Sequence, residues 1–204
     1  MRLVGRDLSP YVRRVAIWCA LQGRPVERMA LAAMEPAAQD ELRGYNPLRR
    51  VPVLLLDDGT SLIETFAICD FLDDTMPDGR LVPATGEARR QSLQRIALAN
   101  STTEKVVAMM YEKNRRPEAL HWPEWQERVA DQSKAGFAAM EAMAPADGFF
   151  GGERPDGSDV VFVCACQQAE VTNPWLLESA GPRLKGLCER AMALEPFRAT
   201  YPTL

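Results

Sequence analysis

The pattern of apolar residues changes near residue 80, and this change limits the folds that the chain can adopt. In the first part, short apolar runs with extended-chain patterning alternate with stretches whose apolar residues recur at helical spacing. The expected strands are residues 2–4, 26–31, 51–56 and 61–63, and the expected helices follow Ser9, precede Tyr45 and follow Glu64. Because strands and helices alternate, residues 1–78 are predicted to form a small α/β domain with a mixed four-stranded sheet.

The second part of the chain carries only helical patterns. Gly and Pro residues recur within residues 76–86 and disfavour regular structure there. We interpret this segment as a linker. Asp156 and Asp159 stand in the cap and N3 places of a capping box, and the following run Val160–Cys166 is apolar on every side, which is typical of a buried helix. The other expected helices are residues 87–114, 124–143 and 182–194, and residues 196–204 receive no assignment. Residues 87–204 are therefore predicted to form an all-α helical domain.

The charge distribution argues against two classes of partner. The formal net charge is −4, and neither part of the chain has a basic excess. A nucleic-acid surface or an anionic membrane surface therefore has no electrostatic basis. The longest apolar run, Val160–Cys166, has seven residues, whereas a membrane-spanning helix needs about 20. With no long apolar stretch near the N-terminus either, we expect a soluble, cytoplasmic protein with no nucleic-acid and no membrane partner.

The five cysteines and the single histidine leave little room for disulfide or metal chemistry. The cysteines are odd in number and form no Cys-x-x-Cys motif, which favours reduced thiols. His121 is the only histidine, and Cys164 and Cys166 point to different faces of an expected helix. No metal site is predicted.

Four short motifs carry the functional signal when they are taken together. They are Ser-Pro-Tyr-Val-Arg-Arg-Val at 9–15, Asn-Pro-Leu-Arg-Arg-Val-Pro-Val-Leu at 46–54, Ile-Glu-Thr at 63–65 and Asp-x-x-Asp at 156–159. In this order and spacing they resemble the cytosolic glutathione S-transferases, in particular bacterial members with an active-site serine. The resemblance implies a thioredoxin-like domain at residues 1–78 that binds the co-substrate glutathione. It also implies an all-α domain at residues 87–204 that contributes the electrophile pocket.

Ser9 matches the position that stabilises the glutathione thiolate in this family. It precedes Pro10 and is expected at the N-cap of the first helix, where the helix dipole favours an anion. An ordinary helix cap is the alternative interpretation of this serine. Tyr11 offers a competing hydroxyl, but it falls inside the first helical turn and is expected to line the substrate pocket.

The resemblance also assigns residues that bind glutathione. Pro52 is expected to be cis, which turns the backbone of Val51 toward the cysteinyl unit of the tripeptide. Glu64 would meet the α-ammonium group, and Thr65 would cap the third helix and help to bind the γ-glutamyl carboxylate.

The glycine carboxylate of glutathione needs a cation or an amide donor. Arg50 is the candidate, and Arg49 and Gln39 are the alternatives. Arg49 stands where the family commonly has glycine, so the loop that leads to Val51 could have a different conformation here.

The electrophile pocket is the part that the sequence describes least. By the resemblance, Leu8 and Tyr11 form one wall and a helix around Met110 forms the other, although a methionine-rich stripe is equally typical of a helix–helix core. Conjugation, reductive dehalogenation and isomerisation of a maleyl-type double bond all begin from the glutathione thiolate. The reaction subtype therefore stays open.

The leading hypothesis is a glutathione transferase of the detoxification type, which activates the glutathione thiolate for attack on a small hydrophobic electrophile. The alternative is a non-catalytic binding or regulatory protein of the same fold. A redox protein that uses Cys19 is a third reading, which the serine at the helix start disfavours. The resemblance further implies a homodimer in which the thioredoxin-like domain of one subunit contacts the helical domain of the other. The polar residues compatible with contacts across this interface are Arg89, Arg90, Asn100, Ser101 and Glu104.

Overall fold

The computed structural model describes residues 1–203, which divide into two compact units. The first unit comprises Met1–Leu81 and Pro196–Thr203, and the second comprises Val82–Glu195. The expected boundaries, residues 1–78 and 87–204, differ from these units at the C-terminal segment, and the roles assigned to the two parts remain predictions. Within the described residues, no helix is long and apolar enough to cross a membrane.

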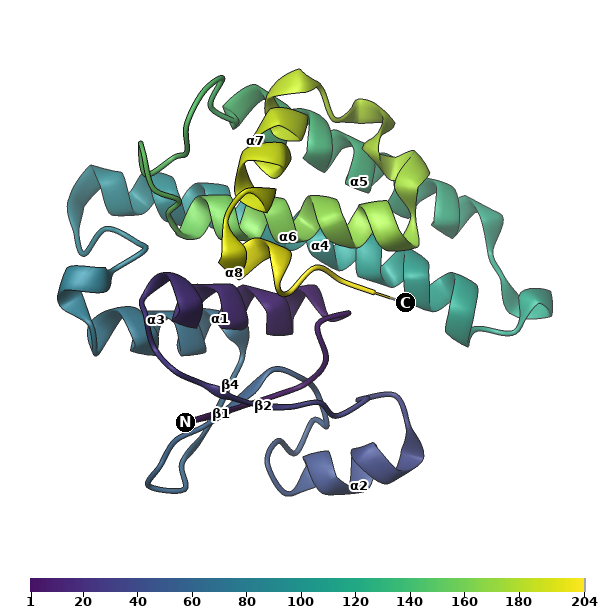
Figure 1. Ribbon diagram of the computed structural model, residues 1–204. Coiled ribbons are helices and arrows are strands. Elements are labelled where there is room, and N and C mark those ends of the chain that lie inside the picture. The colour runs from purple at the N-terminus through teal and green to yellow at the C-terminus, as the bar shows by residue number, and fades with distance from the viewer. Residues whose placement is uncertain (204) are drawn as a thin grey trace. The chain divides into compact units, whose positions relative to one another are not determined.

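The first unit is an α/β structure around one four-stranded sheet (Figure 1). Its elements are β1 (Arg2–Val4), α1 (Pro10–Leu21), β2 (Glu27–Met29), α2 (Pro36–Arg43), β3 (Val53–Leu55), β4 (Ser61–Ile63), α3 (Thr65–Asp74) and the 3-10 helix η1 (Pro77–Gly79). The strand order is β2-β1-β3-β4, in which β1 and β2 are parallel and the other pairs are antiparallel. The predicted mixed sheet is confirmed.

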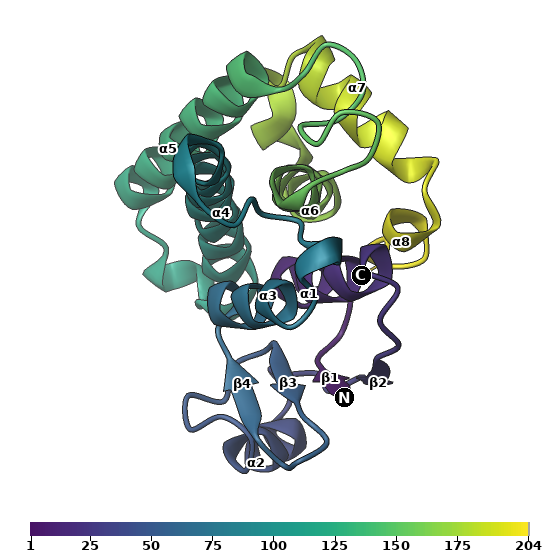
Figure 2. The same ribbon diagram turned by 90° about the vertical axis from the view of Figure 1, so that its left-hand side faces the viewer.

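Both faces of this sheet are covered by helices. Val4, Val53 and Leu55 form a buried cluster with Leu42 of α2. The intervening residue Leu54 is also fully buried, and it points to the opposite face because successive strand residues alternate. On that face α1 and α3 pack against each other (Figure 2). The unit therefore has three layers: α2, the sheet, and the pair α1 and α3.

A buried carboxylate ties α1 to α3. Oδ1 of Asp73 accepts hydrogen bonds from Nε1 of Trp18 at 2.8 Å, from Nε2 of Gln22 at 2.9 Å and from the backbone N–H of Leu81 at 3.1 Å. A buried charge is costly unless such donors satisfy it. The network therefore fixes both helices and the end of the first unit in one arrangement.

The second unit is all helical, as predicted. Its elements are α4 (Gly86–Arg115), the 3-10 helix η2 (Glu118–Leu120), α5 (Pro123–Met143), α6 (Gly157–Thr172), the 3-10 helix η3 (Pro174–Ser179) and α7 (Pro182–Met192). Residues 157–169 of α6 are all buried, which agrees with a helix that is apolar on every side. Helices α4 and α7 pack against α6, which Figure 2 shows almost end-on, and α5 packs against α4.

Carboxylates cap two of these helices. The predicted capping box of α6 is confirmed: Oδ1 of Asp156 accepts from the backbone N–H of Asp159 at 3.3 Å, and Oδ2 of Asp159 accepts from the backbone N–H of Asp156 at 2.7 Å. Glu141 of α5 caps α7 from outside, because its Oε2 accepts from the backbone N–H of Leu184 at 2.8 Å. Both caps satisfy N–H groups that have no partner within the helix.

The sequence pattern located the long elements and missed the short ones. The expected strands 26–31 and 51–56 are reduced to the three-residue strands β2 and β3. The three 3-10 helices η1, η2 and η3 and the single-turn helix α8 (Glu195–Arg198) were not expected. One turn contains too few residues to display a periodic pattern.

Candidate active site

Ser9 stands at the N-terminus of α1, as the sequence predicts. Its backbone is extended, with φ −79° and ψ 118°, Pro10 is the first helical residue, and its Oγ accepts a hydrogen bond from the backbone N–H of Val12 at 3.4 Å. The hydroxyl is half-buried. Ser9 therefore caps the helix beside the positive end of the helix dipole, and accepting this bond leaves its hydroxyl one O–H group to donate.

Val51 lies next to the first turn of α1. The Val51–Pro52 peptide bond is cis, as expected. Gly5, which has φ +126°, fits between the two segments: a Cβ atom there would lie 2.5 Å from Cγ2 of Val12 and 3.0 Å from Cβ of Val51. Only glycine allows this approach. The loop after β1, the start of α1 and Val51 therefore meet at one point, close to Ser9.

Glu64 and Thr65 form the start of α3. Glu64 is the N-cap residue, with φ 66° and ψ 124°, and its side chain makes no capping hydrogen bond. The expectation that Thr65 caps this helix is wrong, because Thr65 is already its first helical residue, where a hydroxyl no longer reaches the N–H groups of the next turn. The first N–H groups of α3 are thus available to an anion.

Arg50 lies beside Glu64. Its Nη1 is 3.9 Å from Oε1 of Glu64, and both side chains are about 60% exposed, at 63% and 62%. An exposed pair at this distance contributes little to stability. A bound molecule with both charges could therefore separate the two groups at small cost.

The loop before Val51 depends on a residue that the sequence analysis did not single out. The buried Asn46 donates from Nδ2 to the carbonyl of Arg50 at 2.9 Å, and its Oδ1 accepts from the N–H of Leu48 at 3.0 Å. The Asn-Pro pair at 46–47 was the available signal, since this pair favours turn initiation. Arg49 takes the left-handed conformation with φ 51°, and Gln39 reaches its carbonyl from Nε2 at 3.5 Å.

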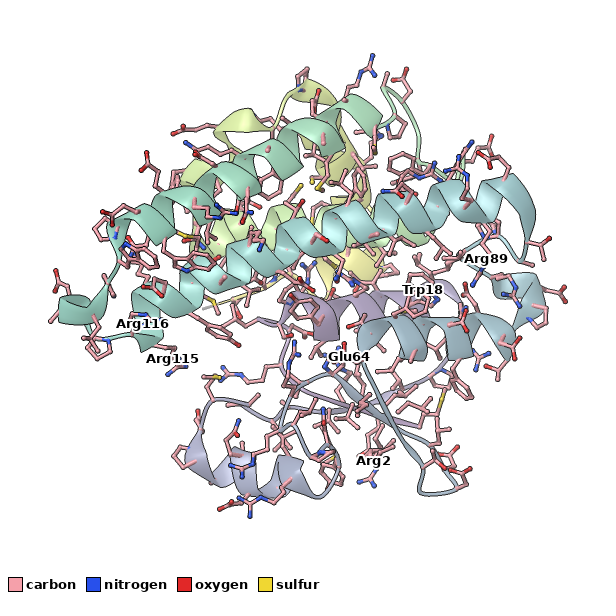
Figure 3. All side chains as sticks on the ribbon, turned by 180° about the vertical axis from the view of Figure 1, so that it is seen from behind. Arg2, Trp18, Glu64, Arg89, Arg115 and Arg116 are labelled. Carbon is pink, nitrogen blue, oxygen red and sulfur yellow. The ribbon has the colours of Figure 1, made fainter. Side chains whose placement is uncertain are left out.

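Two of these contacts involve predicted site residues of the first unit. Val51 lies next to the first turn of α1, which Ser9 caps, and Arg50 lies 3.9 Å from Glu64, the residue labelled in Figure 3. The binding roles that the sequence analysis assigns to them remain predictions.

The predicted pocket residues belong to different units. Leu8 and Tyr11 are half-buried in the first unit, and the guanidinium carbon of Arg14 lies 5.7 Å from the centre of the Tyr11 ring. Met110 belongs to α4 of the second unit, where Nε2 of Gln168 lies 3.8 Å from its sulfur. Their common pocket therefore remains a prediction.

Two further chemistries can be compared with the structure. Cys19 is fully buried in α1, and desolvation raises the pKa of its thiol to about 11, so it is not a thiolate near neutral pH. Among residues 1–203, no three His, Cys, Asp or Glu side chains come together as a group that could hold a metal ion. Asn100 and Glu104, considered above for an interface, bond to each other within α4 at 3.1 Å.

Comparisons with known proteins point to one family. The family model described as glutathione S-transferase, N-terminal domain, matches residues 8–75, and the one described as glutathione S-transferase, C-terminal domain, matches residues 123–190. A maleylacetoacetate isomerase from Pseudomonas aeruginosa is 26% identical over 205 residues, which cover 97% of this chain and 92% of the relative.

Solved structures of similar proteins agree with these matches. A glutathione S-transferase from Methylobacterium radiotolerans, in complex with glutathione sulfonate, has a TM-score of 0.91 at 26% identity, with 100% of this chain and 95% of that chain covered. A glutathione transferase family member from Pseudomonas fluorescens Pf-5, with bound glutathione, has a TM-score of 0.87 at 27% identity, with 100% and 99% covered.

Proposed function

Because the chain belongs to the glutathione S-transferase family, we propose that its first unit binds glutathione and activates the thiol for attack on a small hydrophobic electrophile. The observation that carries this proposal is the position of Ser9 at the positive end of α1, the helix whose first turn lies next to Val51. The glutathione derivatives bound to the similar structures support the choice of co-substrate.

Ser9 is the proposed thiolate donor. When the thiol of bound glutathione loses its proton, the Ser9 hydroxyl donates a hydrogen bond to the sulfur, and the helix dipole adds to the stabilisation of the anion. A hydrogen bond to a charged group contributes about 1.5–3 kcal/mol. This interaction favours the thiolate over the thiol and so lowers the pKa of the bound thiol.

The start of α3 is the proposed site for the γ-glutamyl end of the tripeptide. Its carboxylate would accept from the first N–H groups of α3 and from Thr65, and its ammonium would meet the exposed carboxylate of Glu64. The backbone of Val51 would pair with the cysteinyl unit like an added strand. Pro52 supports this role by holding Val51 next to α1.

Arg50 is the proposed partner of the glycine carboxylate, but its position 3.9 Å from Glu64 equally fits the carboxylate at the γ-glutamyl end. Glutathione esterified at its glycine carboxylate separates the two roles. If Arg50 binds the glycine carboxylate, Arg50→Ala lowers the affinity for glutathione and leaves the affinity for the ester unchanged. An equal loss for both ligands assigns Arg50 to the γ-glutamyl end.

Isomerisation of a maleyl-type double bond is the reaction to test first, because a relative that matches nearly the whole chain is named maleylacetoacetate isomerase. In such a reaction the thiolate adds to one carbon of the double bond, the new single bond rotates, and the thiolate leaves again. Glutathione is regenerated, and no atom is gained or lost. The proposed pocket of Leu8, Tyr11 and Met110 would hold the electrophile.

The deciding experiment has two steps. Isothermal titration with glutathione tests binding, and a lack of binding at millimolar concentration would overturn the proposal. Assays with glutathione and a panel of maleyl compounds, aryl halides, epoxides and peroxides then test turnover. Binding without turnover of any of these compounds would favour the non-catalytic alternative. The proposal includes a homodimer and no requirement for a metal ion.

A further inference from the structure

The buried helix α6 carries two neighbouring glutamines, Gln167 and Gln168, which are 2% and 1% exposed. Nε2 of Gln167 lies 3.0 Å from the sulfur of Met192 on α7, whereas Nε2 of Gln168 lies 3.8 Å from the sulfur of Met110 on α4. The side-chain oxygen Oε1 of Gln168 is buried, and within residues 1–203 it has no hydrogen-bond partner. A buried acceptor in this state costs free energy, so its presence requires an explanation.

The polar side chains that follow Gln168 have no N–H or O–H group left for this oxygen. Thr172, one turn later on α6, donates its hydroxyl proton to the backbone carbonyl of Gln168 at 2.7 Å. The amide nitrogen of Asn173 donates to the carbonyl of Val106 at 3.3 Å and to the hydroxyl of Thr172 at 3.0 Å. An amide nitrogen carries two N–H groups and a hydroxyl carries one, so all three are used. Oε1 of Gln168 is therefore open to a donor from a bound molecule.

The side chain of Met110 is in contact with the carboxamide of Gln168 and with solvent. Helices α4 and α6 pack against each other (Figures 1 and 2). Met110 is half-buried on α4, and its sulfur faces Nε2 of Gln168. A thioether sulfur is only a weak acceptor, and methionine is unbranched with three rotatable bonds. The Met110 side chain can therefore move aside at small cost and expose the carboxamide to a molecule bound against α4.

We propose that Gln168 is a specificity-determining residue of the electrophile pocket. It binds a hydrogen-bond donor and an acceptor that stand side by side on the electrophile, as in a primary amide or an enolised β-dicarbonyl. The donor binds Oε1, and the acceptor replaces the Met110 sulfur at Nε2. This inference rests on the proposed function, which assigns Met110 to the wall of that pocket. A few polar groups in an otherwise apolar pocket fix the orientation of a ligand in this way.

The neutral carboxamide of Gln168 favours uncharged groups. An ionised carboxylate has no donor for Oε1, and its charge would enter a buried position that Gln168 cannot neutralise. An ammonium group would find an acceptor there but no opposite charge from Gln168. The expected class is therefore an electrophile whose polar end is uncharged.

Binding of two glutathione conjugates tests this assignment without requiring turnover. One conjugate is S-benzylglutathione with a carboxamide group on the ring, at the para or the meta position. The other has an acetyl group at the same position, which is similar in size and keeps the carbonyl but has no N–H group. We expect wild type to bind the carboxamide about two- to tenfold more tightly than the acetyl compound at one of the two positions, as for one hydrogen bond. Isothermal titration measures both affinities.

Matched variants identify the side chain responsible. Gln168→Met removes both polar atoms at similar side-chain length, and we expect it to bind the two conjugates equally. It should not lower the melting temperature, since it removes a buried acceptor that has no partner. Gln168→Asn withdraws the carboxamide by one methylene group and should also lose the preference. Gln167→Met is the control, because this glutamine is as deeply buried but contacts α7, and it should keep the preference.

Three results would overturn the proposal: no preference in wild type at either ring position, a preference that persists in Gln168→Met, or an equal loss in Gln167→Met. Titration with unmodified glutathione separates this failure from that of the proposed function. If glutathione binds and wild type does not distinguish the conjugates, only the role of Gln168 is wrong. If glutathione does not bind, the proposed function fails, and the role of Gln168 fails with it.

Discussion

Arg49 and Glu64 hold backbone conformations that usually belong to glycine, with φ 51° and 66°. Such conformations cost a non-glycine residue about 1–3 kcal/mol and persist only where the surrounding structure imposes them. For Arg49 the sequence contained a signal, because the family commonly has glycine at this position. Glu64 carried no such signal, and only the structure reveals that its backbone is strained. Both residues flank the proposed glutathione site, so the strain lies where a ligand would bind.

Two substitutions of Glu64 should distinguish its effect on the stability of the fold from its effect on the affinity for glutathione. We expect Glu64→Gly to raise the free energy of unfolding by about 1 kcal/mol, because glycine relieves the positive φ, and to lower the affinity for glutathione. Glu64→Gln is the matched control, which keeps the strain and should lose affinity with little change in stability. Thermal denaturation and isothermal titration measure the two effects. Unchanged glutathione affinity in both variants would remove Glu64 from the site.

Ser9→Ala should affect catalysis more than binding. The lost hydrogen bond forms with the thiolate and is worth about 1.5–3 kcal/mol, so we expect turnover to fall about ten- to a hundredfold while the glutathione affinity changes little. The pKa of the bound thiol, followed by its ultraviolet absorbance, should rise. Ser9→Thr keeps the hydroxyl and should retain most of the activity. If the rate and the thiol pKa stay the same in Ser9→Ala, Ser9 is only a helix cap.

Asp159 should make the stability of the protein depend on pH. Burial, with a contribution from the neighbouring Asp156 carboxylate, raises the pKa of Asp159 from 3.8 to about 7. The folded state therefore binds this proton more tightly than the unfolded state does. The resulting stability is fully present below pH 3.8 and is lost as the pH rises through about 7.

We expect the stability of Asp159→Asn, relative to wild type, to increase from pH 5 to pH 8, because the variant lacks the Asp159 proton while Asp156, whose pKa burial also raises, is present in both proteins. Urea denaturation at a series of pH values measures this difference. Asp58→Asn is the control, since its pKa lies below 3.8 and it stays charged throughout this range. Parallel pH profiles for wild type and Asp159→Asn would contradict the raised pKa.

Among the elements, α6 shows what a sequence pattern predicts well. Its start follows from the capping box at Asp156 and Asp159, and its burial follows from the uninterrupted run Val160–Cys166. The start of α3 shows the opposite case. The sequence indicates a helix near Thr65 but misplaces the cap by one residue, because Glu64 is the N-cap residue although its side chain makes no capping hydrogen bond. Local patterns thus define an element better than they define its ends.

The crossing of α4 and α5 depends on a glycine that no sequence pattern marked. A Cβ atom on Gly136 would lie 2.2 Å from Oγ1 and 2.9 Å from Cγ2 of Thr102. We expect Gly136→Ala to lower the free energy of unfolding by about 1–3 kcal/mol, although alanine favours the helix. Thermal or urea denaturation measures this loss.

A second variant tests the cause of this loss. Thr102→Ala removes both close atoms and should restore much of the stability of Gly136→Ala, which appears as a positive coupling in a double-mutant cycle. If the effects of the two substitutions on the free energy of unfolding are strictly additive, the contact between residues 102 and 136 does not limit how closely α4 and α5 approach each other.

At the scale of the whole molecule, the sequence predicted the family because the motifs are short and each lies within one unit, whereas the glutathione-binding roles stay predictions. The electrophile pocket could not be predicted in the same way. Leu8, Tyr11 and Met110 come from both units, and no spacing along the chain relates them. The shape and polarity of such a pocket depend on individual side chains. A methionine-rich pattern along a helix does not specify how these side chains are arranged.

The homodimer is the prediction for the whole molecule, and the resemblance to the family carries it. Large apolar side chains are enriched in the cores of protein interfaces, and Phe66, next to Thr65 and 63% exposed, is the residue that we choose to test in the first unit. We expect light scattering to give about twice the chain mass of 22.7 kDa.

Phe66→Glu should shift the protein toward the monomer, because a carboxylate would be buried without a partner. Leu120→Glu, at a residue of the second unit that is 62% exposed, is the matched control and should leave the mass unchanged. A wild-type mass near 22.7 kDa at micromolar concentration would reject the dimer, and a dimeric Phe66→Glu would place the interface elsewhere on the surface.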